Sequence, residues 1–274
     1  LQREEKIMSK RKKRRFIITG IIVALLHLCF TGWKISQYIV HSQGVDIEFP
    51  NSKYMITYSD YGFPRYKVFD KNWSEDRLGD SGWTIGEKGD FLCCVCSVMA
   101  AAGKNGDSTP DKINAIMCEV EGYGKNGDIK KDVLEAIAEN VKYHNSIDPA
   151  LKDNRVVKST DDPNSAFDIV KVKKGDDYRW VVIKGIYGKD YWCMDPKEEK
   201  ESYLSDYGSR VYEWYTIGSL QDGVNVNKKE SVLERIGEIE NRKRKKFIIV
   251  GLFVLLIVSW IIGRKIDHSI KQKG

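Results

Sequence analysis

A chain of 274 residues has room for one ordinary domain with flanking segments. Its formal net charge of +6 comes largely from two basic clusters, residues 10–15 and 242–246, each next to a long apolar run. The central part does not combine basic residues with aromatic ones as a nucleic-acid groove would, so we expect no nucleic-acid partner.

Two long apolar runs stand out from the otherwise polar sequence. Residues 16–33 and 247–263 contain no aspartate, glutamate, lysine or arginine. Helices of this length, at roughly 1.5 Å per residue, cover a hydrocarbon core of roughly 30 Å when their polar ends reach the interface. We therefore expect transmembrane helices at residues 16–35 and 247–263. A cleaved signal peptide is the alternative for the first run, but no small-x-small cleavage site follows it.

These two helices and the composition around them divide the chain into segments. We expect a basic N-terminal segment (1–15), a linker (36–65), a central domain (66–219), a basic linker (220–246) and a C-terminal tail (264–274). Basic residues before the first helix and after the second favour cytoplasmic termini and an external domain. The basic residues of the second linker argue for the opposite orientation, but long translocated domains weaken that objection. We expect a two-pass protein of the cell membrane, in contact with the lipid bilayer, with its central domain extracytoplasmic.

The central domain opens with a glycine-rich turn that leads into an apolar helix. Gly86 and Gly89 supply the turn, and Asp90 is placed to cap the first helical turn. Residues 91–102 are small or apolar on every side, so we expect a buried central helix that ends at Gly103.

Two further helices and a series of strands follow. Thr109 and Pro110 predict the start of a helix that runs to about residue 119, and apolar residues at helical spacing predict another over 130–140. β-branched and aromatic residues predict strands inside the domain and a short one before it, at 54–58. The strands predicted inside the domain are 168–172, 178–184, 191–194 and 211–215. Helices followed by an antiparallel sheet are typical of the α+β class.

Two stretches of the domain resemble papain-like cysteine peptidases of family thirty-nine, the bacteriocin-processing type. The family pattern T-I-G-x-x-G-C, followed by an apolar helix, is similar to residues 84–102, and its T-P-D step matches residues 109–111. The family's histidine strand, H-F/W-V-V-x-x-G followed by a turn, a short strand and D-P, is similar to residues 179–196. The resemblance covers roughly residues 66–217. It implies a papain-like cysteine-peptidase fold, flanked here by two transmembrane helices.

The resemblance also implies where catalytic residues would stand, and this chain departs from the pattern there. Asp90 occupies the nucleophile position and Arg179 the histidine position, while Asp195 keeps the orienting carboxylate. An aspartate cannot perform thiol chemistry, and arginine cannot release its proton near neutral pH. The glutamine that supplies an oxyanion donor in the family has no counterpart near Val68. His144 is the one histidine inside the domain.

We therefore expect a membrane-anchored, catalytically inactive peptidase-like domain that binds a peptide or a protein at the bacterial cell surface. The charges at the two substituted positions are opposite. They predict an ion pair between Asp90 and Arg179, with Asp195 on the other side of the arginine.

Three alternatives remain open. In an active thiol peptidase, a shifted register makes Cys93 or Cys94 the nucleophile, although no histidine base is in place. In a purely structural scaffold, no groove remains beside Asp90. A metal site is disfavoured because Cys93, Cys94 and Cys96 lack a C-x-x-C spacing, and we expect neither a metal nor a cofactor. Small apolar positions in a buried helix account for these cysteines without any chemistry.

Overall fold

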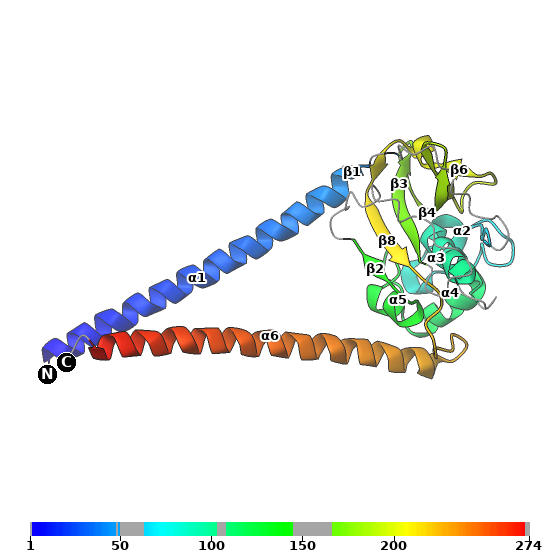
Figure 1. The fold of residues 1–274 in the computed structure, drawn as a ribbon. Coiled ribbons are helices and arrows are strands. Elements are labelled where there is room, and N and C mark those ends of the chain that lie inside the picture. Colours follow the sequence, from blue (N-terminus) through cyan, green and yellow to red (C-terminus); the bar gives the residue numbers. More distant parts are fainter. Residues whose placement is uncertain (1, 48, 50–62, 103–107, 145–165, 272–274) are drawn as a thin grey trace.

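The computed structural model describes residues 2–47, 49, 63–102, 108–144 and 166–271. In the two long end helices it describes the side chains of residues 18–36, 38, 42, 43, 229–252 and 254. The described chain is a domain of helices and an antiparallel sheet, from which two long helices extend on the same side (Figure 1). The prediction of an α+β domain is therefore confirmed.

The N-terminal helix α1 (Gln2–Gln43) is continuous and contains the first predicted transmembrane helix. Its segment Ile18–Ser36 is the one stretch of the described residues that is long and apolar enough to cross a membrane. The helix continues into the predicted linker because residues 36–43 contain neither glycine nor proline. Gly44, with a φ of 68°, follows its last residue.

The C-terminal helix α6 (Lys229–Lys271) begins well before the second predicted transmembrane helix. The basic linker predicted over 220–246 is thus mostly helical. The physical reason is an apolar stripe at helical spacing, in which Val232 and Ile239 are buried in the same core as helix α5 (Lys131–Ile137). This contact fixes the first turns of α6 to the domain.

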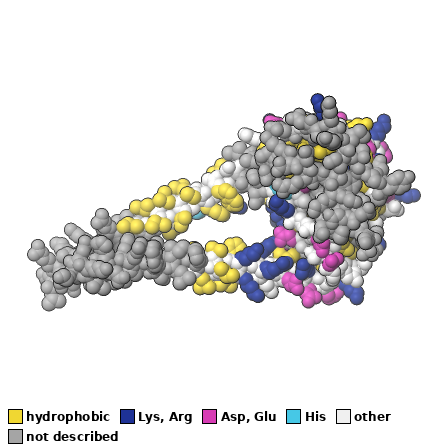
Figure 2. Space-filling model, viewed as in Figure 1, with side chains coloured by type: hydrophobic (Ala, Val, Ile, Leu, Met, Phe, Trp, Pro, Cys, Tyr) yellow, Lys and Arg dark blue, Asp and Glu magenta, His cyan; other side chains and the backbone are white. Residues whose placement is uncertain are grey.

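A basic band separates this contact from the apolar part of α6. Residues 242–246 are all basic and exposed, and Figure 2 shows them as a dark blue band between the domain and the apolar side chains that follow. Lys243 forms a salt bridge of 3.0 Å with Glu135 on α5. Most side chains of residues 247–263 lie outside the described set, so the second transmembrane helix stays a prediction.

Three short helices and α3 (Asp90–Ala102) form the helical part of the domain. The short helices are α2 (Ile85–Lys88), α4 (Pro110–Glu119) and α5. The predicted turn before α3 is itself a helical turn, because the Glu87 side chain accepts a hydrogen bond from the Thr84 backbone N–H at 2.9 Å. Helix α5 ends three residues earlier than predicted because Ala138 turns into an extended bridge with Leu220. The helix stop predicted at Gly103 lies outside the described residues.

In the described residues, six antiparallel strands form the main sheet, in the order β2-β8-β3-β4-β5-β6. The strands are β2 (Lys142–Tyr143), β3 (Phe167–Lys174), β4 (Asp177–Tyr187), β5 (Asp190–Met194), β6 (Ser202–Tyr203) and β8 (Glu213–Ile217). A separate ribbon pairs β1 (Val45–Asp46) with β7 (Arg210–Val211). The strand predictions inside the domain are confirmed, except that the last one is divided between β7 and β8 at Tyr212. The strand predicted at 54–58 lies outside the described residues.

The main sheet buries both of its faces. Along β3, Ile169 lies in the core shared with helix α3, whereas Val170 and Val172 lie in a second apolar cluster on the opposite face. Helix α3 packs against β3, β4 and β8 (Figure 1). Its apolar side chains are buried as predicted, except those of Phe91 and Ala100, which are partly exposed. Residues of η3 (Leu204–Tyr207) and of the β1–β7 ribbon cover the second cluster. The sheet therefore holds the start of α3 against the middle of β4, and the candidate site is built there.

Candidate functional site

Asp90 stands where helix α3 meets strand β4. The chain reaches it through Gly89, where an added Cβ atom would lie 2.6 Å from the carbonyl oxygen of Ile85 and 2.5 Å from its Cγ2. No other residue fits there without a shift of the backbone. This tight passage makes Asp90 the first residue of α3, one position later than the capping role that the sequence suggests.

The carboxylate of Asp90 is buried and faces the backbone of β4. Its Oδ2 accepts a hydrogen bond from the N–H of Trp180 at 2.9 Å, and the residue is only 6% exposed. Burial raises the pKa of Asp90, while the charge of Lys197 and the backbone N–H donors act in the opposite sense. Keeping Asp90 ionised in the folded protein therefore costs free energy.

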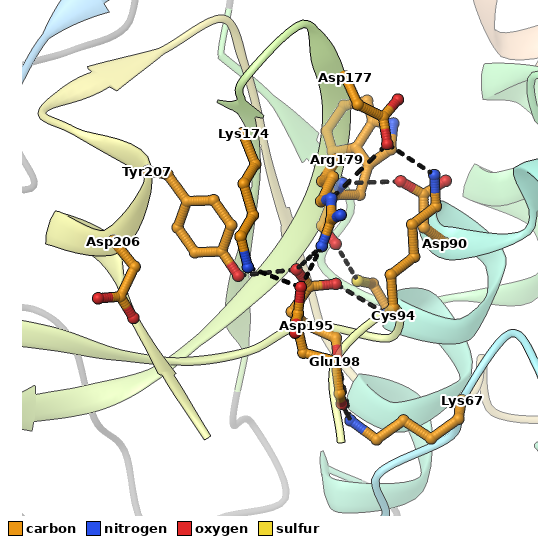
Figure 3. A network of polar contacts seen from close by, with 12 residues as sticks. Lys67, Asp90, Cys94, Lys174, Asp177, Arg179, Asp195, Glu198, Asp206 and Tyr207 are labelled. Carbon is orange, nitrogen blue, oxygen red and sulfur yellow. Dashed lines mark hydrogen bonds and ion pairs between the residues drawn. The ribbon is translucent and has the colours of Figure 1, made fainter. Parts of the chain in front are cut away.

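The predicted ion pair between Asp90 and Arg179 is wrong. Among the described residues, the carboxylates within salt-bridge distance of Arg179 belong to Asp177, Asp195 and Glu198, at 3.6, 3.2 and 2.6 Å (Figure 3). Asp195 is fully buried and needs a partner for its charge, whereas Asp90 is satisfied by a backbone N–H. The part of the prediction that places Asp195 beside the arginine is confirmed.

Asp195 is the centre of a hydrogen-bond network. Its Oδ2 also accepts a hydrogen bond from the hydroxyl of Tyr207 at 2.7 Å, and its Oδ1 accepts one from the backbone N–H of Lys197 at 2.7 Å. Lys67 donates to the backbone oxygen of Asp195 at 2.9 Å and to that of Glu198 (Figure 3). Burial raises the pKa of Tyr207, so its hydroxyl keeps its proton and remains a donor. The orienting position of the resemblance is therefore occupied by a carboxylate with a full set of partners.

Glu198 completes the network at its exposed edge. Glu198 accepts hydrogen bonds from Lys174 and Arg179, and both lower its pKa, the bond from Lys174 more strongly. Glu198 therefore stays ionised. The Lys174 Nζ to Glu198 Oε1 distance is 2.6 Å. Arg179 is thus held between the buried carboxylate of Asp195 and the partly exposed carboxylate of Glu198.

The alternative nucleophiles, Cys93 and Cys94, are both fully buried in α3. Burial raises the pKa of both thiols, and the nearby Asp90 carboxylate raises it further. The Cys94 thiol donates a hydrogen bond to the Trp180 carbonyl oxygen at 3.3 Å. Neither side chain lines the cleft described below, so these thiols are placed as core residues.

The other residues examined for catalysis also have structural contacts. His144 stacks on Trp214 with 4.1 Å between ring centroids, and its Nε2 lies 2.8 Å from the hydroxyl of Thr216. Both contacts are outside the cleft. Val68, at the position of the family's oxyanion donor, is buried and donates its backbone N–H to the Pro196 oxygen at 3.2 Å.

A cleft of about 600 Å³ lies beside Asp90. One wall is aromatic: the Phe91 ring lies 4.5 Å from that of Trp180 and 5.1 Å from that of Tyr215, between centroids. Trp83 and Tyr178, both exposed, also line it. The volume is within the usual range of ligand sites. This geometry can hold a ligand, and among the described residues that line it there is neither a cysteine nor a histidine.

Lys197, Glu198 and Tyr207 are parts of the site that the sequence reasoning missed. A local signal exists for the first two, because they directly follow Asp195-Pro196 in the turn that presents that aspartate. Tyr207 has no such signal, since it comes from a separate 3₁₀ turn and reaches Asp195 only through the folding of the sheet.

Comparisons with known proteins found no match to this chain. No family model matches it, and neither a curated protein nor a solved structure is similar to it. Among the described residues, no group of three or more His, Cys, Asp or Glu side chains is arranged to hold a metal ion. The function is therefore inferred from the residues of the site and their contacts.

Proposed function

We propose that this protein is a membrane-anchored, catalytically inactive relative of papain-like cysteine peptidases that binds a peptide or a protein segment at the bacterial cell surface. The observation that carries the proposal is the cleft beside Asp90, which lies where the resemblance puts a catalytic centre. A purely structural scaffold is not expected to keep such a cleft.

The proposal of inactivity is supported by the groups around the cleft. Asp90 and Arg179 fill the nucleophile and base positions of the resemblance with side chains that supply neither a thiolate nor a proton acceptor near neutral pH at the histidine position. Arg179 is further committed to Asp195 and Glu198. The buried, proton-bearing thiols of α3 supply no substitute, so the alternative of an active thiol peptidase has no support from the geometry.

The proposed membrane anchoring combines one observed apolar segment with a second one that we infer. Ile18–Ser36 is long and apolar enough to cross a bilayer, and we infer a second span at residues 247–263 from its apolar composition within the continuous helix α6. Both helices leave the domain on the same side, which suits two crossings of one bilayer (Figure 1). We assign the domain to the outer side, with both termini in the cytoplasm.

Restoring the missing pair tests the peptidase-like geometry. In every form tested, including the one called wild type, Cys29 and Cys118 are replaced by serine because both are exposed. The full chain in lipid nanodiscs is treated at neutral pH with a peptide that carries a thiol-reactive electrophile. We expect no labelling of the wild type, slow labelling of D90C, and about tenfold or faster labelling of the double variant D90C/R179H, because an imidazolium beside Asp195 lowers a thiol pKa.

Two outcomes would overturn the proposal. Equal labelling of D90C and D90C/R179H would show that the two positions do not form a catalytic pair. Labelling of wild-type Cys93 or Cys94, abolished by replacement with alanine, would support the active thiol peptidase instead.

A further inference from the structure

The charges that line the cleft leave an excess of two carboxylates over ammonium groups. The carboxylates belong to Glu87, Asp90, Asp128, Asp176, Asp177 and Glu213. The ammonium groups belong to Lys88, Lys131, Lys171 and Lys197. Asp176 and Asp177 are also paired with cations outside this lining, Lys173 at 3.7 Å and Arg179 at 3.6 Å. A preference for a positively charged ligand therefore depends on the carboxylates that have no such partner.

Two of the four lysines are already neutralised by neighbours in the same lining. Lys171 lies 2.8 Å from Glu213, and Lys197 lies 3.4 Å from Asp177. They therefore offer little charge to an acidic ligand.

The other two lysines show how this part of the protein holds a cation. The Lys88 ammonium lies 4.2 Å from the centroid of the Trp83 ring, and the Lys131 ammonium lies 3.3 Å from that of Tyr143. Aromatic faces attract cations through the negative potential above the ring.

Asp90 and Asp128 form no salt bridge among the described residues, and they border the aromatic wall of the cleft. Asp90 immediately precedes Phe91 and accepts a hydrogen bond from the backbone of Trp180, while Asp128 lines the same cleft. Carboxylates near a cluster of aromatic rings are an arrangement that holds an ammonium or guanidinium group on an alkyl stem.

We propose that the cleft binds a basic side chain of its peptide ligand, a lysine or an arginine, with the cation toward Asp90 and Asp128 and the alkyl stem on Phe91, Trp180 and Tyr215. The proposal rests on the peptide-binding function inferred above and names the ligand chemistry of that same cleft.

The experiment uses the full chain in nanodiscs and a positional-scanning library of hexapeptides, in which each pool fixes one residue type at one position. Retained pools are measured by mass spectrometry. We expect retention of the pools fixed with lysine or arginine over those fixed with norleucine, citrulline or glutamate. The norleucine and citrulline pools match the stems without the charge.

Variants locate the selective group. D90N and D128N should each weaken binding of a retained lysine peptide about tenfold and leave its norleucine analogue unaffected, whereas F91L should weaken both several-fold because both share the alkyl stem. D168N is the control: Asp168 is a carboxylate with hydrogen bonds to Trp214 and Thr216, away from the cleft, and its loss should leave binding unchanged. D128N keeps the test decisive if D90N unfolds, because Asp128 is exposed.

The outcomes separate the two proposals. Retention without preference for a basic residue, or preference for glutamate, overturns this inference and leaves peptide binding intact. Retention of no pool overturns both. Lysine selectivity that D90N and D128N leave unchanged places the cation elsewhere and also overturns the inference.

Discussion

At the scale of single residues, the charge of Asp90 carries a cost. Burial raises the pKa of Asp90 above its ordinary value of 3.8, so the folded state binds this proton more tightly than the unfolded chain. The stability that the protonated form contributes is complete below about pH 4 and is lost as the pH rises through the raised pKa. Asp90→Asn keeps an acceptor for the Trp180 N–H and removes the charge.

We therefore expect D90N to raise the melting temperature by a few degrees near neutral pH and to change it little below about pH 4. Thermal unfolding of both forms, followed by tryptophan fluorescence between pH 4 and 8, measures this. A melting temperature that falls at pH 7 would mean that the ionised Asp90 stabilises the fold.

Arg179 is expected to matter through Asp195. Because Asp195 is fully buried, Arg179→Met leaves its charge without an ion pair and should cost about 3 kcal/mol in the free energy of unfolding. Arg210→Met is the control: its salt bridge with Asp46 is exposed on both sides, so the loss of stability should be much smaller. Chemical denaturation of the nanodisc-embedded chain distinguishes the two, and equal losses would contradict the argument.

The positions of the site residues could be predicted, but their partners could not. Asp90 and Asp195 stand where glycine turns, apolar spacing and a proline place them, and these are local signals. Opposite charge alone wrongly paired Asp90 with Arg179. Which carboxylate pairs with Arg179 depends on how much hydration each one loses on folding. For Asp195, the surroundings are set by Tyr207 and by the turn after Asp195, and a local sequence pattern does not reveal them.

At the scale of elements, the passage from α2 to α3 depends on the missing side chain of Gly89. Gly89→Ala puts a methyl group against the Ile85 carbonyl and must shift α3, with an expected loss of about 2 kcal/mol or more. Gly237→Ala is the control, because its Cβ meets nothing within 4 Å in helix α6, and it should stabilise by about 0.5–1 kcal/mol.

Melting temperatures of the two variants measure these opposite effects. If G89A were neutral, the tight passage would not be what sets the start of α3. In that case the placement of Asp90 would need another explanation.

Elements with strong local patterns were predictable, and those shaped by contacts were not. Helix α4, with Thr109 and Pro110 at its start, and the β-branched strands follow from the sequence alone. Helix α6 did not, because the basic run over 242–246 obscures an apolar stripe before it, and that stripe is explained only by its packing on α5.

At the scale of the whole molecule, two crossings of one membrane require both termini on the same side. We expect protease added to intact spheroplasts to digest the central domain while epitope tags at both ends remain protected until the cells are permeabilised. The reason is that α1 and α6 leave the domain together (Figure 1). Protection of one tag alone would mean a single crossing, and a protected domain with both tags digested would mean the opposite orientation.

The two attachments of the long helices to the domain differ in how they would bear a mechanical load. Helix α1 passes through one glycine into the two-residue ladder of β1 and β7. In the described residues, this ladder is extended by the Ile47 N–H bond to Ser209 and by exposed side-chain bonds of Asp46 to Ser209 and Arg210. Helix α6 is seated by Val232 and Ile239 in the core itself. Under tension between domain and helices, β1 is expected to peel away first, one hydrogen bond at a time, while α6 holds. The N-terminal attachment is thus expected to separate from the domain at a lower force than the C-terminal attachment.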